Sequence, residues 1–229
     1  PLARRFAGPL AGWFTVAWLS VAYFPQFASR FGVRHVSLPL LLGATALAFW
    51  WAWETPAGRP GRYFLAGLLQ GLTFYTYQPA RFTPLLFAGF FIYLFLCHRA
   101  QWRRHLVGFG VFTITALVVA LPLVWLLAGN QQVEADRAWT IAPLTELLQG
   151  NFSPVWANAL ATVGMFSLKG DPLVSYNVPG RPVFVPVWTS LFFYGGLLLA
   201  LWRWRRPAYA FVLIWLPVML APTVLTVSA

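Results

Sequence analysis

The stretch LVGFGVFTITALVVALPLVWLLA, residues 106–128, contains no charged residue. An α-helix needs about 20 predominantly apolar residues to cross the hydrocarbon core of a bilayer, and this stretch is long enough. Several other apolar runs approach the same length, so we predict an all-α integral membrane protein, a helical bundle of about seven spans. The predicted spans are Leu10–Ala28, Val36–Trp53, Tyr63–Pro79, Phe82–Cys97, Leu106–Ala128, Pro186–Trp202 and Ala208–Ser228.

The composition of the whole chain agrees with this class. Hydrophobic residues make up 59% of the 229 residues and charged residues only 9%, whereas soluble domains contain about 45–50% apolar and about 25% charged residues. The formal net charge of +11 would indicate nucleic-acid binding in a soluble chain. Here the cationic residues are almost all arginines between apolar runs, so their charge reports membrane topology and no nucleic-acid partner is expected. A single cysteine and three scattered histidines give no disulfide and no metal-ligand spacing.

Arginines are distributed unequally between the two sides of the predicted bundle. One side carries Arg4, Arg5, Arg59, Arg62, Arg99, Arg103, Arg104, Arg203, Arg205 and Arg206, and the other carries Arg30, Arg34 and Arg81. The positive-inside rule assigns the first side to the cytoplasm. We therefore expect a multi-pass protein of a bacterial plasma membrane with its N-terminal side in the cytoplasm. The long connection between the fifth and sixth spans, residues 129–185, then lies outside the cytoplasm. The absence of a leader or polar tail makes us expect an internal segment of a longer protein.

The long connection is predicted to contain a short helix. Ser153 is expected to cap its N-terminus, Pro154 occupies the first position, and an apolar stripe follows at helical spacing. This helix should lie on the membrane surface or cap the bundle. The segment after it, residues 169–182, is rich in proline and glycine and predicts an irregular loop, either functional or a solvated connector.

Several features of the spans indicate packing. Pro79 predicts a tight helical hairpin between the third and fourth spans, since proline cannot continue the preceding helix. Gly67 and Gly71 form a small-xxx-small contact motif, and Gln70 between them is expected to make an interhelical hydrogen bond. Cys97 at the inner boundary is expected to be inert. The predicted spans contain no internal carboxylate, which argues against an ion-coupled transporter.

Polar residues near the predicted outer face suggest an anion site. If the turn that carries them is helical, Arg30 and Arg34 lie on one side of it and form a phosphate clamp. A second group consists of Tyr75, Tyr77, Gln78 and Arg81. The four-residue spacing of Gln78 from Phe74 and of Arg81 from Tyr77 would present this group across a helix end. The alternative interpretation is that these arginines only extend to the lipid headgroups.

Five stretches resemble bacterial GT-C glycosyltransferases. The resemblance is greatest to family-39-like proteins, which include the protein O-mannosyltransferases and the lipid A aminoarabinose transferase. The stretches are SRFGVR (29–34), GLLQGLTFYTYQPARFTP (67–84), FSLKGD (166–171), NVPGRP (177–182) and WLPVMLAP (215–222). The resemblance covers most of the chain, residues 1–229, as part of a GT-C-like transmembrane domain.

The resemblance implies inverting transfer of a sugar from a polyprenyl-phosphate donor to an acceptor at the outer membrane face, as in a hexosyltransferase. Sugar, acceptor and any metal cofactor stay open. The donor phosphate would be bound by Arg30, Arg34 and Arg81, with Tyr75, Tyr77 and Gln78 orienting phosphate or sugar. The loop residues expected to touch sugar or acceptor are Asp136, Lys169, Asp171 and Asn177.

The family's catalytic base is an acidic residue of the first extracytoplasmic loop, for which this segment has no counterpart. The segment is therefore expected to contain no catalytic residue of its own and to be inactive alone. Two other classes remain open. A non-enzymatic lipid-phosphate or anion carrier, or a flippase-type subunit, would use the same arginines without bond cleavage, and a purely structural subunit would tolerate their replacement.

Overall fold

The computed structural model describes residues 1–22, 26, 36–55, 60–129, 146–147, 149–170, 179–185 and 188–225. Within these ranges the regular elements are helices. They are α1 (Leu2–Ala7), α2 (Pro9–Val21), α4 (Ser37–Trp53), α5 (Pro60–Thr73), the 3₁₀ helix η2 (Gln78–Phe82), α6 (Thr83–Cys97), α7 (Arg99–Ala128), α10 (Ser153–Met165), α11 (Trp188–Trp202) and α12 (Pro207–Val224).

The helices follow the predicted apolar runs. Three continuous helical stretches are long and apolar enough to cross a membrane, namely Gln78–Cys97, Arg99–Ala128 and Pro207–Val224. Helices α2, α4 and α11 are apolar but shorter, and α5 has only 14 residues and carries Arg62 in its first turn. The all-helical class is confirmed for the described residues, and three helices are long and apolar enough to span a membrane. The number of seven spans stays a prediction.

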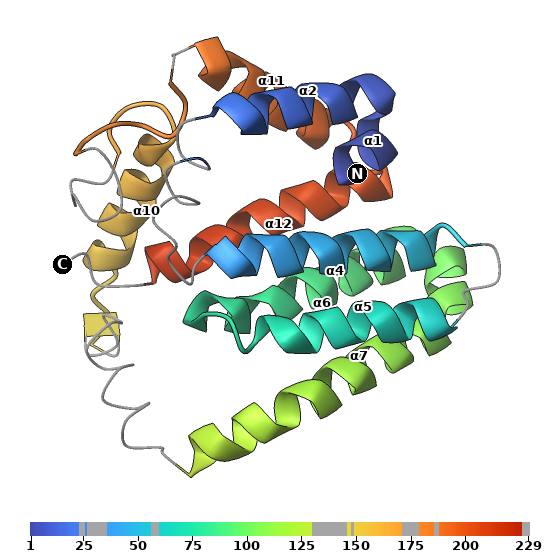
Figure 1. Cartoon of the computed structure of the whole chain (residues 1–229). Helices are drawn as coiled ribbons and strands as arrows, with labels where there is room; N and C mark the ends of the chain where they lie inside the picture. Colours follow the sequence, from blue (N-terminus) through green and yellow to red (C-terminus); the bar gives the residue numbers. More distant parts are fainter. Residues whose placement is uncertain are drawn as a thin grey trace.

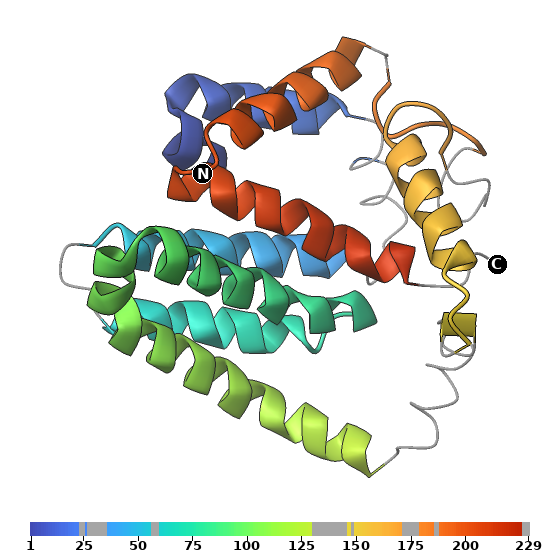
Figure 2. The same ribbon diagram turned by 180° about the vertical axis from the view of Figure 1, so that it is seen from behind.

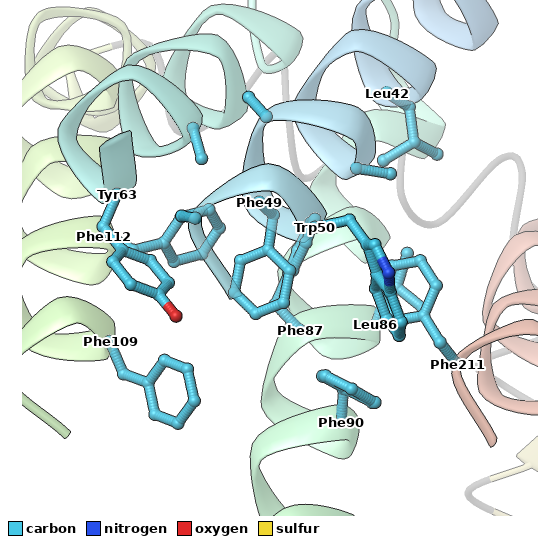
Figure 3. Close-up of a cluster of buried hydrophobic side chains, with 14 of the residues drawn as sticks. Leu42, Phe49, Trp50, Tyr63, Leu86, Phe87, Phe90, Phe109, Phe112 and Phe211 are labelled. Carbon is cyan, nitrogen blue, oxygen red and sulfur yellow. The ribbon is translucent and has the colours of Figure 1, made fainter. Parts of the chain in front are cut away.

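Helix α4 lies at the centre of an aromatic core. The ring of Phe49 is fully buried and lies 5.2 Å from that of Phe87 on α6 and 5.6 Å from that of Phe112 on α7. Phe211 of α12 stacks on Phe49 at 6.4 Å, so four helices converge on one side chain (Figure 3). Burying several large aromatic rings in this way is a major source of packing energy, together with a preference for offset or edge-on contacts.

Helix α5 packs closely on α7 through its glycines. A methyl group built on Gly67 would lie 2.5 Å from the carbonyl oxygen of Phe112, and one built on Gly71 would lie 2.5 Å from the Cβ of Val119. Only residues without a side chain allow this approach, which is the reason for the small-xxx-small spacing. The predicted contact motif is confirmed.

The bundle has two distinct ends. Figures 1 and 2 show α1, the C-terminus of α4, the α6–α7 junction and the α11–α12 junction at one end, and η2, the C-terminus of α7 and helix α10 at the other. The Tyr93 hydroxyl donates to the carbonyl of Arg205 at 2.8 Å, which ties α6 to the α11–α12 junction. We call the first the arginine-rich end, because the described residues there include Arg4, Arg5, Arg62, Arg99, Arg103, Arg104, Arg203, Arg205 and Arg206. We call the other the η2 end.

Candidate functional site

The predicted hairpin between α5 and α6 is present and is built around η2. Helix α5 ends at Thr73, and the next three residues form a tight turn in which the Thr76 N–H donates to the Thr73 carbonyl at 3.0 Å. Tyr77 then adopts an extended conformation, with φ −158° and ψ 153°, before η2 begins. Pro79 lies in the first turn of η2, where its missing N–H costs nothing.

This geometry corrects one expectation from the sequence. Four-residue α-helical spacing was expected to present Gln78 with Phe74 and Arg81 with Tyr77 across a helix end. The α-helix stops before Phe74 and Tyr77 is extended, so these pairs do not share a helical face. Pro79 prevents one α-helix from running through the whole segment, and it lies in the first turn of the new 3₁₀ helix, where proline is tolerated.

A buried polar cluster at the junction of α5 and α6 holds the backbone of η2. The Nε2 of Gln70 donates to the Oγ1 of Thr83 at 2.6 Å, and the Thr83 hydroxyl donates to the carbonyl of Ala80 at 2.7 Å. Thr73 joins the cluster by donating to the Gln70 carbonyl at 2.6 Å. Gln70 is only 1% exposed, so this network lies in an apolar surrounding where its hydrogen bonds face little competition from water.

Gln70 thus makes the interhelical hydrogen bond that was predicted, from α5 to the first residue of α6. Sequence reasoning missed its partners Thr73 and Thr83 and their effect on the backbone next to Arg81. The signal available was a threonine three residues after Gln70 and another directly before Pro84 at the start of α6. The cluster connects the α5–α7 packing to η2, so the position of Arg81 depends on the core of the bundle.

Arg81 is exposed in the last turn of η2, and Tyr77 and Gln78 are half-buried beside it in the chain. A guanidinium offers a planar fork of donors that matches phosphate oxygens. Tyr75 lies differently, because its hydroxyl donates to the carbonyl of Val119 on α7 at 2.8 Å although its side chain is 49% exposed. Tyr75 therefore braces the hairpin against α7, and its oxygen can only accept a further hydrogen bond.

Lys169 lies in another part of the η2 end. It follows α10 in a loop whose two sides are joined by hydrogen bonds, from the Gly170 N–H to the Gly180 carbonyl at 3.0 Å and from Phe184 to Phe166 at 2.9 Å. Phe166 stacks on Phe193 of α11 at 5.1 Å, so this loop packs on α11 while η2 packs on α6 and α12. Both sides of the loop lack regular structure where they are described, as predicted. Arg30, Arg34, Asp136, Asp171 and Asn177 lie outside the described residues.

The predicted short helix of the long connection is α10. Its expected cap is wrong, since Ser153 is the first helical residue and its backbone N–H donates to the Oδ1 of Asn151 at 3.1 Å. The asparagine, two residues earlier, can reach this N–H because the intervening residue forms the turn. Helix α10 packs on α12, with Thr162 buried and the Nδ2 of Asn158 donating to the Val224 carbonyl at 3.3 Å. It thereby caps the η2 end of the bundle.

The described residues contain no group of three or more His, Cys, Asp or Glu side chains that could hold a metal ion. Their two carboxylates are far apart in the chain, with Glu54 paired to Arg5 at the arginine-rich end and Glu146 bonded to Asn151 at the start of the α10 region. Among the described residues, η2 offers an arginine and polar side chains that can bind an anion and form hydrogen bonds.

Comparison with known proteins adds no family to this description. No family model matches the chain, and neither the curated proteins nor the solved structures contain a match.

Proposed function

We propose that this chain is part of a membrane glycosyltransferase that transfers a sugar from a polyprenyl-phosphate donor to an acceptor at the extracytoplasmic face. The observation that carries the proposal is the support of Arg81, an exposed arginine on a 3₁₀ turn. The Thr83 hydroxyl holds the Ala80 carbonyl of this turn and is itself bound by the buried Gln70. A rigid support of this kind is what a preorganised phosphate-binding group needs.

In this proposal Arg81 binds the donor phosphate and stabilises the negative charge that develops on it. The acceptor oxygen attacks the anomeric carbon, the bond from that carbon to the phosphate oxygen breaks, and the polyprenyl phosphate leaves with the bonding electron pair. Tyr77 and Gln78 orient the phosphate or the sugar. The acceptor proton passes to the carboxylate that the resemblance assigns to a loop outside this segment.

The membrane orientation belongs to the same proposal. The unequal distribution of arginines supports a cytoplasmic arginine-rich end and an η2 end that faces outward in a bacterial plasma membrane. The donor phosphate would then meet η2 at the level of the outer headgroups. Two interactions join segments of the arginine-rich end. Arg5 forms an ion pair with Glu54, and the Nε2 of His98 is bonded to the Arg205 carbonyl at 2.9 Å. Both are consistent with these segments lying on one side of the membrane.

The test uses the complete protein in proteoliposomes with a polyprenyl-phosphate donor labelled in its sugar. We expect Arg81→Gln to lower turnover by about 100-fold, the typical effect of losing one donor to a developing anion. Arg81→Lys should retain part of the activity, because lysine keeps the charge but not the planar fork. Arg103→Gln, the matched control, removes an exposed arginine at the opposite end and should leave turnover unchanged.

The outcomes separate the three classes of function. Release of unglycosylated polyprenyl phosphate that depends on Arg81 supports the transferase. Binding or transbilayer movement of the intact donor, with no cleavage by the wild-type protein, would instead indicate a carrier or flippase-type subunit. Equal behaviour of Arg81→Gln and Arg103→Gln would contradict a role for η2 in either activity and leave the structural subunit.

A further inference from the structure

A cleft with a volume of about 990 Å³ lies between α1 and α2 on one side and α4 and α5 on the other. Figure 1 shows these two groups of helices, with α1 at the arginine-rich end and α2 extending toward the η2 end. The side chains that form its walls are mostly apolar, and Trp13 and Val16 among them are exposed. The wall residues include Trp13, Val16, Ala44, Leu47, Leu65 and Leu69.

The mouth of the cleft is cationic. Arg4 and Arg5 line it together with Trp51, and the guanidinium of Arg62 lies over the Trp51 ring at 4.0 Å from its centroid. Arg5 is paired with Glu54. Arg4 is exposed, and its guanidinium makes no hydrogen bond or ion pair within the part of the chain that the structure describes. With Arg4 and Arg5 in the lining and Arg62 beside it on Trp51, three guanidinium groups face one carboxylate, so this end of the cleft carries a positive charge.

The polarity of the cleft therefore changes along its length, from arginines at the end of the bundle to apolar side chains toward the middle. A small soluble anion would make no favourable contact with the apolar walls. A neutral apolar lipid would leave the arginines without a hydrogen-bond acceptor. An anionic phospholipid matches both parts, since its phosphate accepts guanidinium hydrogen bonds while its acyl chains cover apolar surface. In a membrane the protein is also surrounded by lipid molecules, which could enter such a cleft.

We propose that this cleft binds one anionic phospholipid from the leaflet at the arginine-rich end. Its phosphate is held by Arg4, with Arg5 and Arg62 adding to the positive potential, and its acyl chains lie between α2 and α4. This site is at the opposite end of the bundle from η2, and it does not rest on the proposed transferase activity. The bound lipid would fill the space between the α1–α2 unit and the α4–α5 pair.

Native mass spectrometry of the whole chain in detergent tests this site. The protein is titrated with phosphatidylglycerol and with phosphatidylcholine of identical acyl chains. The wild-type chain should retain one phosphatidylglycerol in preference to phosphatidylcholine. Arg4→Gln should weaken phosphatidylglycerol retention by about fivefold, the effect of one arginine near an anionic headgroup. Arg103→Gln, an exposed arginine of the same end outside the cleft, should have no effect.

A second pair of variants tests the apolar part. Ala44→Trp fills the cleft and should abolish the retained lipid of either headgroup, whereas Leu40→Trp, at an exposed position of α4 outside the cleft, should not. Circular dichroism verifies that each variant is folded. Equal losses in Arg4→Gln and Arg103→Gln would overturn the headgroup assignment, and lipid retention by folded Ala44→Trp would overturn the acyl-chain assignment. A lipid-free dimer would assign the cleft to a second copy and overturn the proposal.

Discussion

Both ends of the bundle carry arginines, but the two ends are built differently. At the arginine-rich end, guanidinium groups lie over aromatic rings, such as Arg62 over Trp51 and Arg99 over Phe95, in the manner of side chains that anchor helices at an interface. At the η2 end, Arg81 stands on a short 3₁₀ turn that a buried polar network holds in place. We propose that the number of arginines at an end reflects membrane topology, whereas the way a single arginine is supported indicates a binding site.

The largest effect on stability is expected from disrupting the packing of α5 on α7, next to η2. Gly71→Leu places a branched side chain against Val119 and the Ala116 carbonyl on α7, and should lower the free energy of unfolding by about 3 kcal/mol. Gly110→Leu is the matched control, because nothing lies within 4 Å of a methyl group there. Chemical unfolding in detergent measures both. Equal stability of the two variants would show that α5 and α7 do not approach closely at Gly71.

The next effect is expected from the buried network itself. Gln70→Leu removes the hydrogen bond to Thr83 and should lower the free energy of unfolding by about 1 kcal/mol, as for interhelical hydrogen bonds in membrane proteins. If the network positions Arg81, the same variant lowers kcat/KM of the complete protein by about tenfold. Gln101→Leu, at an exposed position of α7 near the arginine-rich end, should change neither quantity. A loss of stability without any loss of transfer would separate the network from the site.

The smallest effects are expected from two tyrosines, one at each end. Tyr75→Phe removes the hydrogen bond to Val119, and Tyr93→Phe removes those to Trp204 and Arg205. Each should lower the free energy of unfolding by about 0.5 kcal/mol, with Tyr93 the costlier because it is more deeply buried. Thermal unfolding of the two variants gives these values. Only Tyr75→Phe should also lower transfer, and a drop in transfer for Tyr93→Phe alone would reverse the assignment of the two ends.

Local features of the bundle could be predicted from the sequence. Apolar runs locate the helices, Pro79 marks the hairpin, and the Gly67–Gly71 spacing marks the close contact with another helix. Each of these depends on residues within one or two helical turns. The helical spacing assumed between Tyr77 and Arg81 was wrong, because a turn and an extended residue separate α5 from η2.

Contacts between distant segments could not be predicted in this way. The Tyr75 hydroxyl meets a carbonyl 44 residues later, and the cleft behind Arg4 is formed by helices whose packing no single stretch specifies. At the start of α10 the side-chain oxygen that accepts a backbone hydrogen bond belongs to Asn151, which accepts from the Ser153 N–H. Serine and asparagine are both common at helix starts, so the turn geometry decides which of them is used. The all-helical class and the long apolar helices could therefore be predicted from the sequence. The shape of the site depends on tertiary packing.

The most direct test asks whether the two ends face opposite sides of the membrane. The chain contains one cysteine, Cys97, which is exposed at the arginine-rich end and reports that end without any substitution. Gln78→Cys combined with Cys97→Ser reports the η2 end. Intact bacterial cells that express each protein are treated with a membrane-impermeant maleimide. We predict labelling of Gln78→Cys in intact cells and of Cys97 only after permeabilisation. Labelling of both from one side, or the reverse order, would contradict an outward-facing donor site at η2.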